Sequence, residues 1–485
     1  MKKKRTDLKQ NKRTRILPVL CLSLFLAACE AGGPGDAIPE LETPKQSTIG
    51  IPKQTTAPVS TTASATEASA PIAPENDPTA SAPDGSAADG TTAAVTTEAP
   101  TTEPPGPTIP VIDTDYEVNS KLTDDMYNAA TNRLGSDNTF RMAGVIKKAQ
   151  AGEPVTVVML GAAALTGQGA VKPAKSTEEL LHEYWKEMFP ASELSIILDT
   201  QSANDPYFAI HRAARFVAVN PDLVMIDYSA VDDGSDETTL YLENLVRRYM
   251  TCDSQPAVML LFSNQVQQDD KDSQRTIGVR YRLPMLSFGD AIAEGLEENV
   301  FSDRSQVITE SNILTGVGHA VYAATLERYF NTIRAYIRSD KFNTSYVLPD
   351  STPDASRYNG SHIADNETIR PSAKSGISKG SAVSQDYPNG WSSNSAGFEI
   401  TFKITSRNLG ILYRVVPDAA GAIVDVFVDG NYVKTISCGD TELTAPCDRS
   451  TELYNTGAKA THIVTMRQKS GTAGSFFALL ALLVS

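Results

Sequence analysis

The chain has 485 residues, a formal net charge of −15 and a hydrophobic fraction of 41%. This length is enough for two or three domains once non-globular segments are removed. Residues 1–28 carry eight basic side chains and one acidic side chain, so their removal would take the net charge to −22. A surface this acidic excludes nucleic acid and anionic lipid headgroups as expected partners.

The first 28 residues have the pattern of a secretion signal. A basic stretch from Lys2 to Arg15 precedes the apolar segment Ile16–Ala28. An apolar segment of 13 residues is too short to span a bilayer as a stable anchor. We therefore predict a signal peptide over residues 1–28.

This segment ends in Leu26-Ala27-Ala28-Cys29, which resembles the lipobox of bacterial lipoproteins. In that motif the cysteine becomes the lipidated N-terminus after cleavage, so the resemblance implies lipid attachment at Cys29. It also implies the membrane as a partner and the extracellular face of the bacterial cell membrane as the location. More than one acyl chain is needed for stable attachment. The alternative is an ordinary small-residue cleavage site that happens to contain a cysteine.

Residues 29–115 are rich in Thr, Pro and Ala and contain no aromatic residue. Such a composition cannot bury enough apolar surface to offset the entropy of ordering. We predict a disordered linker over this range.

Residues 116–335 alternate short apolar runs with amphipathic stretches. The expected strands are Val155–Leu160, Leu194–Leu198, Leu223–Tyr228 and Val258–Phe262. The expected helices are Thr177–Met188, Tyr207–Val219, Thr239–Met250 and Gly318–Ile333. This alternation predicts an α/β domain with a parallel sheet between two helical layers.

A polar connecting segment is expected over residues 336–390, and strict alternation begins after it. Residues 391–485 contain several runs of strand length, and Phe398–Ile404 alternates most clearly. The other runs are Gly410–Val416, Ala422–Val428, Tyr432–Ser437, His462–Gln468 and Phe476–Val484. They predict a C-terminal antiparallel β-sandwich. The last run is too short for a membrane span and is expected to be a core strand.

Several segments together resemble the SGNH/GDSL hydrolases, and most closely the secreted bacterial members that carry an additional β-domain. In chain order they are Lys147–Gly169, Asn220–Gly234, Leu242–Arg248, Pro256–Ser263, Leu283–Ala291 and Gly318–His319. The resemblance covers roughly Phe140 to Ile333. It implies a flavodoxin-like three-layer αβα domain and, in the family, ester hydrolysis by a serine nucleophile.

The catalytic positions of that family are occupied by other residue types here. The serine position holds Ala163, the oxyanion glycine falls near Ala203, and the oxyanion asparagine falls on Asp232. The aspartate and histidine of the late Asp-x-x-His pair fall on Glu310 and Ile313. A methyl group cannot attack an ester, an isoleucine cannot accept a proton, and a carboxylate opposes a developing oxyanion. The resemblance therefore implies no catalytic residues at these positions.

The cysteines and acidic residues give weaker indications. Cys438 and Cys447 flank a short loop and are disulfide candidates in an oxidising compartment, which leaves Cys252 single. No Cys-x-x-Cys or Cys/His cluster points to a metal site, and no cofactor is expected. The acidic stretch Asp232–Glu237 has the composition of a cation site, but a solvated acidic loop is the simpler interpretation.

We interpret the chain as a surface lipoprotein with a degenerate SGNH-type domain that recognises envelope or environmental polysaccharide without catalysis. This interpretation rests on the family's association with acylated carbohydrates, which is an argument by analogy. Two alternatives stay open. One is an active carbohydrate O-acyl esterase that uses a non-standard residue set, with Ser229 and His319 as the residues to test. The other is a protein-interaction module built on the β-sandwich.

Overall fold

The computed structural model describes residues 121–132, 137–161, 165, 170, 174–199, 205–263, 272–309, 313–380, 384, 386–418, 420–471 and 474–485. All of them belong to one compact unit, Thr102–Ser485. The predicted signal peptide, Cys29 and the predicted linker lie outside the described residues.

The first half of the described chain forms a five-stranded parallel sheet. Its strands are β1 (Val155–Gly161), β2 (Leu194–Leu198), β3 (Leu223–Asp227), β4 (Ala257–Phe262) and β5 (Met285–Ser287). They lie in the order β2-β1-β3-β4-β5, and every neighbouring pair is parallel. The four predicted strands are all present, and β5 was missed because three residues are too few to show a period.

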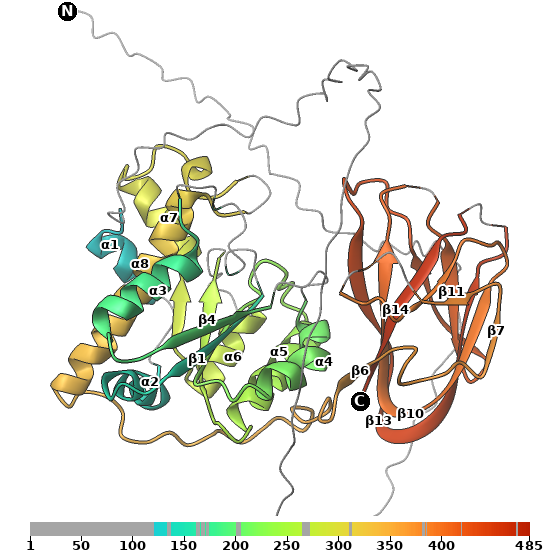
Figure 1. Cartoon of the computed structure of the whole chain (residues 1–485), viewed down its shortest axis with the longest axis horizontal. Helices are drawn as coiled ribbons and strands as arrows, with labels where there is room; N and C mark the ends of the chain where they lie inside the picture. The colour runs from blue at the N-terminus through green and yellow to red at the C-terminus, as the bar shows by residue number, and fades with distance from the viewer. Residues whose placement is uncertain are drawn as a thin grey trace, which may run out of the picture. The chain divides into compact units, whose positions relative to one another are not determined.

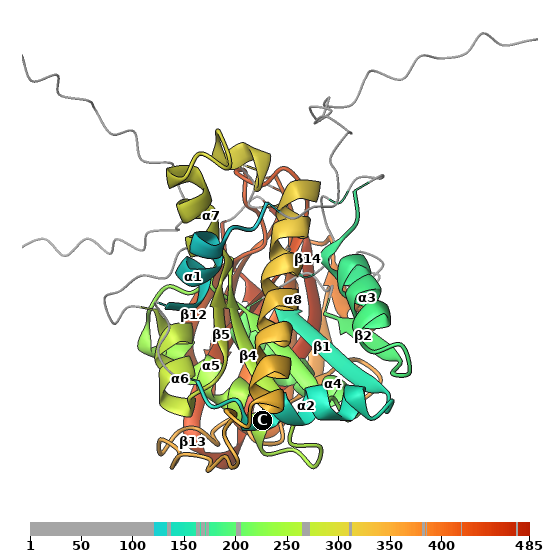
Figure 2. The same cartoon turned by 90° about the vertical axis from the view of Figure 1, so that its left-hand side faces the viewer.

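Helices cover both faces of this sheet. They are α1 (Asp124–Asn132), α2 (Phe140–Gln150), α3 (Thr177–Met188), α4 (Pro206–Val217), α5 (Asp236–Met250), α6 (Ser273–Tyr281), α7 (Phe288–Glu297) and α8 (Gly316–Arg338). Helices α1, α2, α3, α7 and α8 share one core with the sheet, and α4, α5 and α6 share another. Figure 2 looks onto the face covered by α8. Within the described residues, no helix is both long and apolar enough to cross a membrane.

The strand side chains divide between these two cores by simple alternation. In β1, Val157 and Met159 point into the first core, while Val158 and Leu160 point into the second. Both sets are fully buried, which explains why Val157–Leu160 is a continuous apolar run.

The described chain after residue 361 forms one hydrogen-bonded sheet of nine strands (Figure 1). Its strands are β6 (His362–Ala364), β7 (Ala373–Ser375), β8 (Ser378–Lys379), β9 (Trp391–Ser393), β10 (Glu399–Val415), β11 (Ile423–Val428), β12 (Asn431–Ser437), β13 (Cys447–Gln468) and β14 (Phe477–Val484). All the paired strands are antiparallel. A parallel α/β domain followed by an antiparallel β-domain is the fold class that the sequence predicts, and it is confirmed.

Two long strands replace several shorter ones that the sequence predicts. The runs Phe398–Ile404 and Gly410–Val416 are the two halves of β10, which continues through register shifts between them. Its partner β13 extends the predicted run His462–Gln468 back to Cys447. Register shifts of this kind bend a strand without ending it, so one sheet can wrap around one core. That core includes Phe398, Phe402 and Trp391.

Strand β14 is buried on both faces. Phe477, Leu479, Leu482 and Val484 lie in the core of the β-domain, while Ala478, Leu480, Ala481 and Leu483 lie in the core that α4, α5 and α6 share with the parallel sheet. A register shift at Leu412 and Tyr413 places Leu480 and Ala481 on the same side. The C-terminal run is therefore a core strand, as predicted, and it joins the two domains.

Candidate functional site

A buried hydroxyl cluster surrounds Asp227 at the carboxyl edge of the parallel sheet. Ser263 Oγ donates to Asp227 Oδ2 at 2.5 Å, and Ser229 Oγ donates to Oδ1 at 2.7 Å. The Tyr322 hydroxyl, from α8, donates to Oδ2 at 3.3 Å. Burial is the largest influence and raises the pKa of Asp227, although these donors oppose it. The neighbouring Gly161 has φ of 110°, and a Cβ there would overlap the Asp227 carbonyl oxygen, so this edge requires a glycine.

Within the described residues, this cluster consists of hydroxyl groups around one carboxyl group. The Ser229 hydroxyl donates to a carboxylate and accepts from the Ser263 backbone N–H at 3.0 Å. All five histidines lie in the described part of the chain, and none is among the hydrogen-bond partners of Asp227. A serine hydroxyl needs an adjacent base to become a nucleophile, and this one donates to a carboxylate.

Two of the residues that align with catalytic positions of the SGNH/GDSL hydrolases, Asp232 and Ile313, are described. Asp232 is tied into its loop, because Oδ1 accepts from the Gly234 N–H at 3.0 Å and Oδ2 from the Gln274 N–H at 2.8 Å. Burial raises the pKa of the neighbouring Asp272 to about 6, and the charge of Asp232 adds to the shift. Ile313 is partly buried in a turn before α8, and its carbonyl accepts from the Thr309 N–H at 2.8 Å. Ala163, Ala203 and Glu310 lie outside the described residues.

His319 occupies a packed position in the first turn of α8. It is fully buried, and its Nδ1 accepts from the Thr177 N–H at 3.2 Å, at the start of α3. The Thr177 hydroxyl lies 2.9 Å from the same nitrogen. These contacts connect the N-termini of α3 and α8 through His319.

Within the described residues, a cleft of about 540 Å³ lies between the α/β domain and the β-domain. This volume is in the range of sites for small ligands. The α/β domain contributes its loop before α4, the loop after β3 and the first turns of α5. The β-domain contributes β12 and the first half of β13. The lining residues are Asp205, Pro206, Tyr207, Val231, Glu237, Thr238, Tyr241, Lys434, Asp448, Arg449, Ser450, Thr451, Glu452, Leu453 and Tyr454.

Two carboxyl groups hold the walls of this cleft together. Glu452 accepts from the Tyr358 hydroxyl at 2.7 Å and from the Tyr241 hydroxyl at 3.2 Å. Asp205 caps the N-terminus of α4 by accepting from the Phe208 N–H, and it also accepts from the Ser450 hydroxyl of β13, each at 2.8 Å. Burial raises the pKa of both carboxyl groups. Each therefore connects the two domains through hydrogen bonds from neutral hydroxyl groups.

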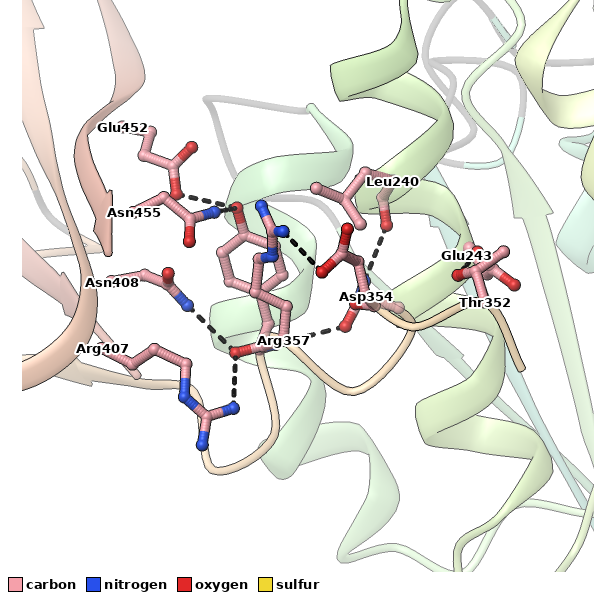
Figure 3. A network of polar contacts seen from close by, with 11 residues as sticks. Leu240, Glu243, Thr352, Asp354, Arg357, Arg407, Asn408, Glu452 and Asn455 are labelled. Carbon is pink, nitrogen blue, oxygen red and sulfur yellow. Dashed lines mark hydrogen bonds and ion pairs between the residues drawn. The ribbon is translucent and has the colours of Figure 1, made fainter. Parts of the chain in front are cut away.

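The segment between the domains adds a second set of bonds, drawn in Figure 3. The Arg357 carbonyl accepts from Asn408 Nδ2 at 3.0 Å, and Asn244 Nδ2 donates to the Asp354 carbonyl at 3.0 Å. Thr352 donates to Glu243 of α5 at 2.5 Å. The segment thus bonds to α5 on one side and to β10 on the other, which ties the two domains together.

One backbone contact at this interface requires a glycine. A Cβ at Gly410 of β10 would overlap the Tyr207 hydroxyl and would lie 2.6 Å from the Thr451 carbonyl oxygen. Tyr207 therefore approaches the backbone of β10 directly, in the floor of the cleft.

The predicted disulfide is wrong: Cys252, Cys438 and Cys447 are all free thiols. Cys438 follows β12 and is fully buried in the β-domain core, where burial raises the pKa of its thiol to about 12. Cys447 begins β13, is partly exposed, and lies in register with Val415 of β10. Nearness in sequence suggested the bridge, and both side chains do pack into the same β-domain core, but their sulfur atoms are not bonded. No group of His, Cys, Asp and Glu suited to a metal ion occurs among the described residues.

No protein-family model matches the chain, and no curated protein matches it in sequence. Two solved structures of a two-domain esterase active on acetylated mannans are similar to it in fold. One, co-crystallised with mannopentaose, has 22% identity and a TM-score of 0.61 over 74% of this chain and 97% of that chain. The other has 21% identity and a TM-score of 0.64 over 74% of this chain and 98% of that chain. At these identities the similarity establishes the two-domain fold.

His211 makes the interface sensitive to pH, because it is buried against Tyr207 and Tyr358. Burial lowers the pKa of this imidazole to about 3. Between pH 6.5 and 3 the unfolded chain binds a proton at His211 and the folded chain does not, so stability is lost as pH falls below 6.5. Between pH 6.5 and 5 the expected loss is about 2 kcal/mol in the free energy of unfolding.

Urea unfolding of the wild type and of His211→Gln at pH 7, 6 and 5 measures this contribution. The variant should lose less stability than the wild type on acidification. His182→Gln, which replaces a more exposed histidine on α3, is the control and should follow the wild type. Equal slopes for wild type and His211→Gln would contradict the prediction.

Proposed function

We propose that the chain is a non-catalytic, polysaccharide-binding surface lipoprotein, and that the cleft between its two domains holds the glycan. The observation that carries the proposal is this cleft of about 540 Å³, which both domains line with tyrosines, hydroxyl groups and charged side chains. Tyrosine combines an apolar ring face with a polar hydroxyl, and a sugar ring presents apolar C–H faces and hydroxyl edges.

The proposed absence of catalysis is supported by the side chains that stand at the catalytic positions of the SGNH/GDSL hydrolases. Ala163 has no nucleophilic atom and Ile313 has no basic atom, so neither half of a nucleophile–base pair is present there. Among the described residues, no histidine is a hydrogen-bond partner of Asp227. The combined loss of nucleophile and base should leave no turnover by the serine mechanism.

The choice of ligand is supported by the two similar structures. They come from an esterase active on acetylated mannans, and one contains mannopentaose. Mannans and mannooligosaccharides are therefore the first ligands to test.

Mannopentaose should bind to the full chain carrying Cys29→Ser, in calorimetry or on a glycan array. Tyr241→Ala should weaken binding about tenfold, because it removes a ring from the cleft wall. Tyr336→Ala, which truncates an exposed tyrosine on α8, is the control and should leave affinity unchanged. Melting temperatures must show that both variants fold. Undiminished affinity in folded Tyr241→Ala would exclude this cleft as the binding site.

The same protein should hydrolyse neither aryl acetates nor acetylated mannan above the buffer rate. Ala163→Ser alone should also be inactive, since its hydroxyl has no base. The triple variant Ala163→Ser, Ile313→His, Asp232→Asn is expected to recover weak activity if Glu310 orients the new imidazole. Hydrolysis by the wild type that Ser229→Ala or His319→Ala abolishes would establish the esterase alternative instead.

The anchor is tested separately in a bacterial host that lipidates proteins. The wild type should sediment with membranes, and Cys29→Ser should appear in the medium, because it lacks the thiol that carries the lipid. Cys252→Ser is the control and should remain with the membranes. Retention of Cys29→Ser would mean that another segment anchors the chain.

A further inference from the structure

Lys434 and Glu237 occupy opposite walls of the interdomain cleft. Lys434 lies on β12 of the β-domain, and Glu237 lies in the first turn of α5. The charge of Glu237 acts on Lys434, so the two are within electrostatic range. Both residues are described, and no direct ion pair joins them. Both side chains line the cleft, where a ligand can reach them.

The ammonium group of Lys434 has one donor to spare. Its Nζ donates to Thr451 Oγ1 at 2.9 Å and to the Glu452 carbonyl at 2.7 Å. A lysine ammonium carries three protons, so a third remains after these two bonds. The two bonds also fix the position of Nζ, which reduces the entropy lost when a ligand binds.

The other charged groups of the cleft are already bonded within the protein. Asp205 and Glu452 accept from hydroxyl groups, Asp448 pairs with Arg414 at 2.6 Å, and Arg449 pairs with Asp440 at 2.7 Å. Glu237 differs from the other described carboxylates of the cleft, because it is exposed and no hydrogen bond or ion pair holds its side chain. It is thus the carboxylate available to accept from a ligand.

We propose that Lys434 and Glu237 form a clamp for two adjacent hydroxyl groups of a neutral sugar ring, with the ammonium donating to one oxygen and the carboxylate accepting from the other. This clamp rests on the function proposed above and adds its chemical specificity. Adjacent hydroxyls offer an acceptor and a donor side by side, which matches this pair. Acidic side chains outnumber basic ones in the cleft, so glycans bearing carboxylate or phosphate groups should be repelled.

The first experiment measures mannopentaose binding to the full chain carrying Cys29→Ser. Glu237→Gln should weaken binding about tenfold, because a charged hydrogen bond to the ligand becomes a neutral one. Lys434→Met should weaken it similarly, and the double variant should lose less than the product of the two effects, since both groups hold one ring. The controls Glu442→Gln and Lys459→Met change exposed residues outside the cleft and should bind normally.

The second experiment changes the ligand. Periodate cleaves the carbon–carbon bond between adjacent hydroxyls, and borohydride then reduces the resulting aldehydes, so treated mannopentaose lacks the diol. The wild type should bind the treated sugar no better than the double variant binds the native one. Equal affinity of the wild type for treated and native sugar would overturn the clamp.

The outcomes separate the clamp from the proposed function. If Glu237→Gln binds mannopentaose normally while Tyr241→Ala does not, the cleft remains a glycan site and the clamp is wrong. If all the cleft variants bind like the wild type, or if the wild type does not bind, both proposals fail. Since Glu237 is exposed and makes no bond within the protein, its substitution leaves the fold intact.

Discussion

Strand β14 packs its two faces into two different cores. One face completes the β-domain around Phe398 and Phe402, and the other completes the core beneath α4 and α5. A strand of eight buried residues has no face for solvent, so it needs both domains in place. Burial of Leu480 and Leu483 stabilises the domain contact by roughly 1.5–3 kcal/mol each. The interdomain cleft keeps its shape because this apolar contact holds its walls.

The polar groups around the cleft depend on that contact. Tyr241 of α5 and Tyr358 both donate to Glu452 of β13, at the same interface between the domains into which β14 packs. Buried hydrogen bonds of this kind add geometric specificity to an apolar interface, and they are costly if either partner withdraws. His211, neutral at the same interface, extends this dependence to pH. The two domains of this chain therefore behave as one structural unit.

The carboxyl edge of the parallel sheet and the cleft have different chemical characters. At the edge, Asp227 is surrounded by hydroxyl donors and its raised pKa reflects burial. In the cleft, Lys434 and Glu237 keep hydrogen-bonding capacity that the protein does not use. In the proposed function, recognition has persisted where the two domains meet, while the position of the nucleophile, Ala163, has lost its reactive atom. A binding protein needs the first of these features and not the second.

The sequence alone determined the local features of this protein. Alternation with period two and continuous apolar runs predicted four of the five parallel strands and the C-terminal core strand, because side-chain burial follows directly from these periods. The sequence also predicted that Asp232 follows the third strand and that Ile313 precedes the last helix. In the structure they follow β3 and precede α8. The linker, Cys29, Ala163 and Glu310 fall outside the described residues and stay predictions.

Tertiary structure decided the rest. The sequence did not indicate the cleft, because Glu237 and Lys434 are nearly two hundred residues apart and neither belongs to a motif. It did not show that β10 is a single strand, since a bend from a register shift looks like a break between two runs. It wrongly paired Cys438 with Cys447, because nearness along the chain, even within one core, does not by itself bring two sulfur atoms to bonding distance. These features depend on which face of β14 packs against which helix, and that is a property of the whole packed molecule.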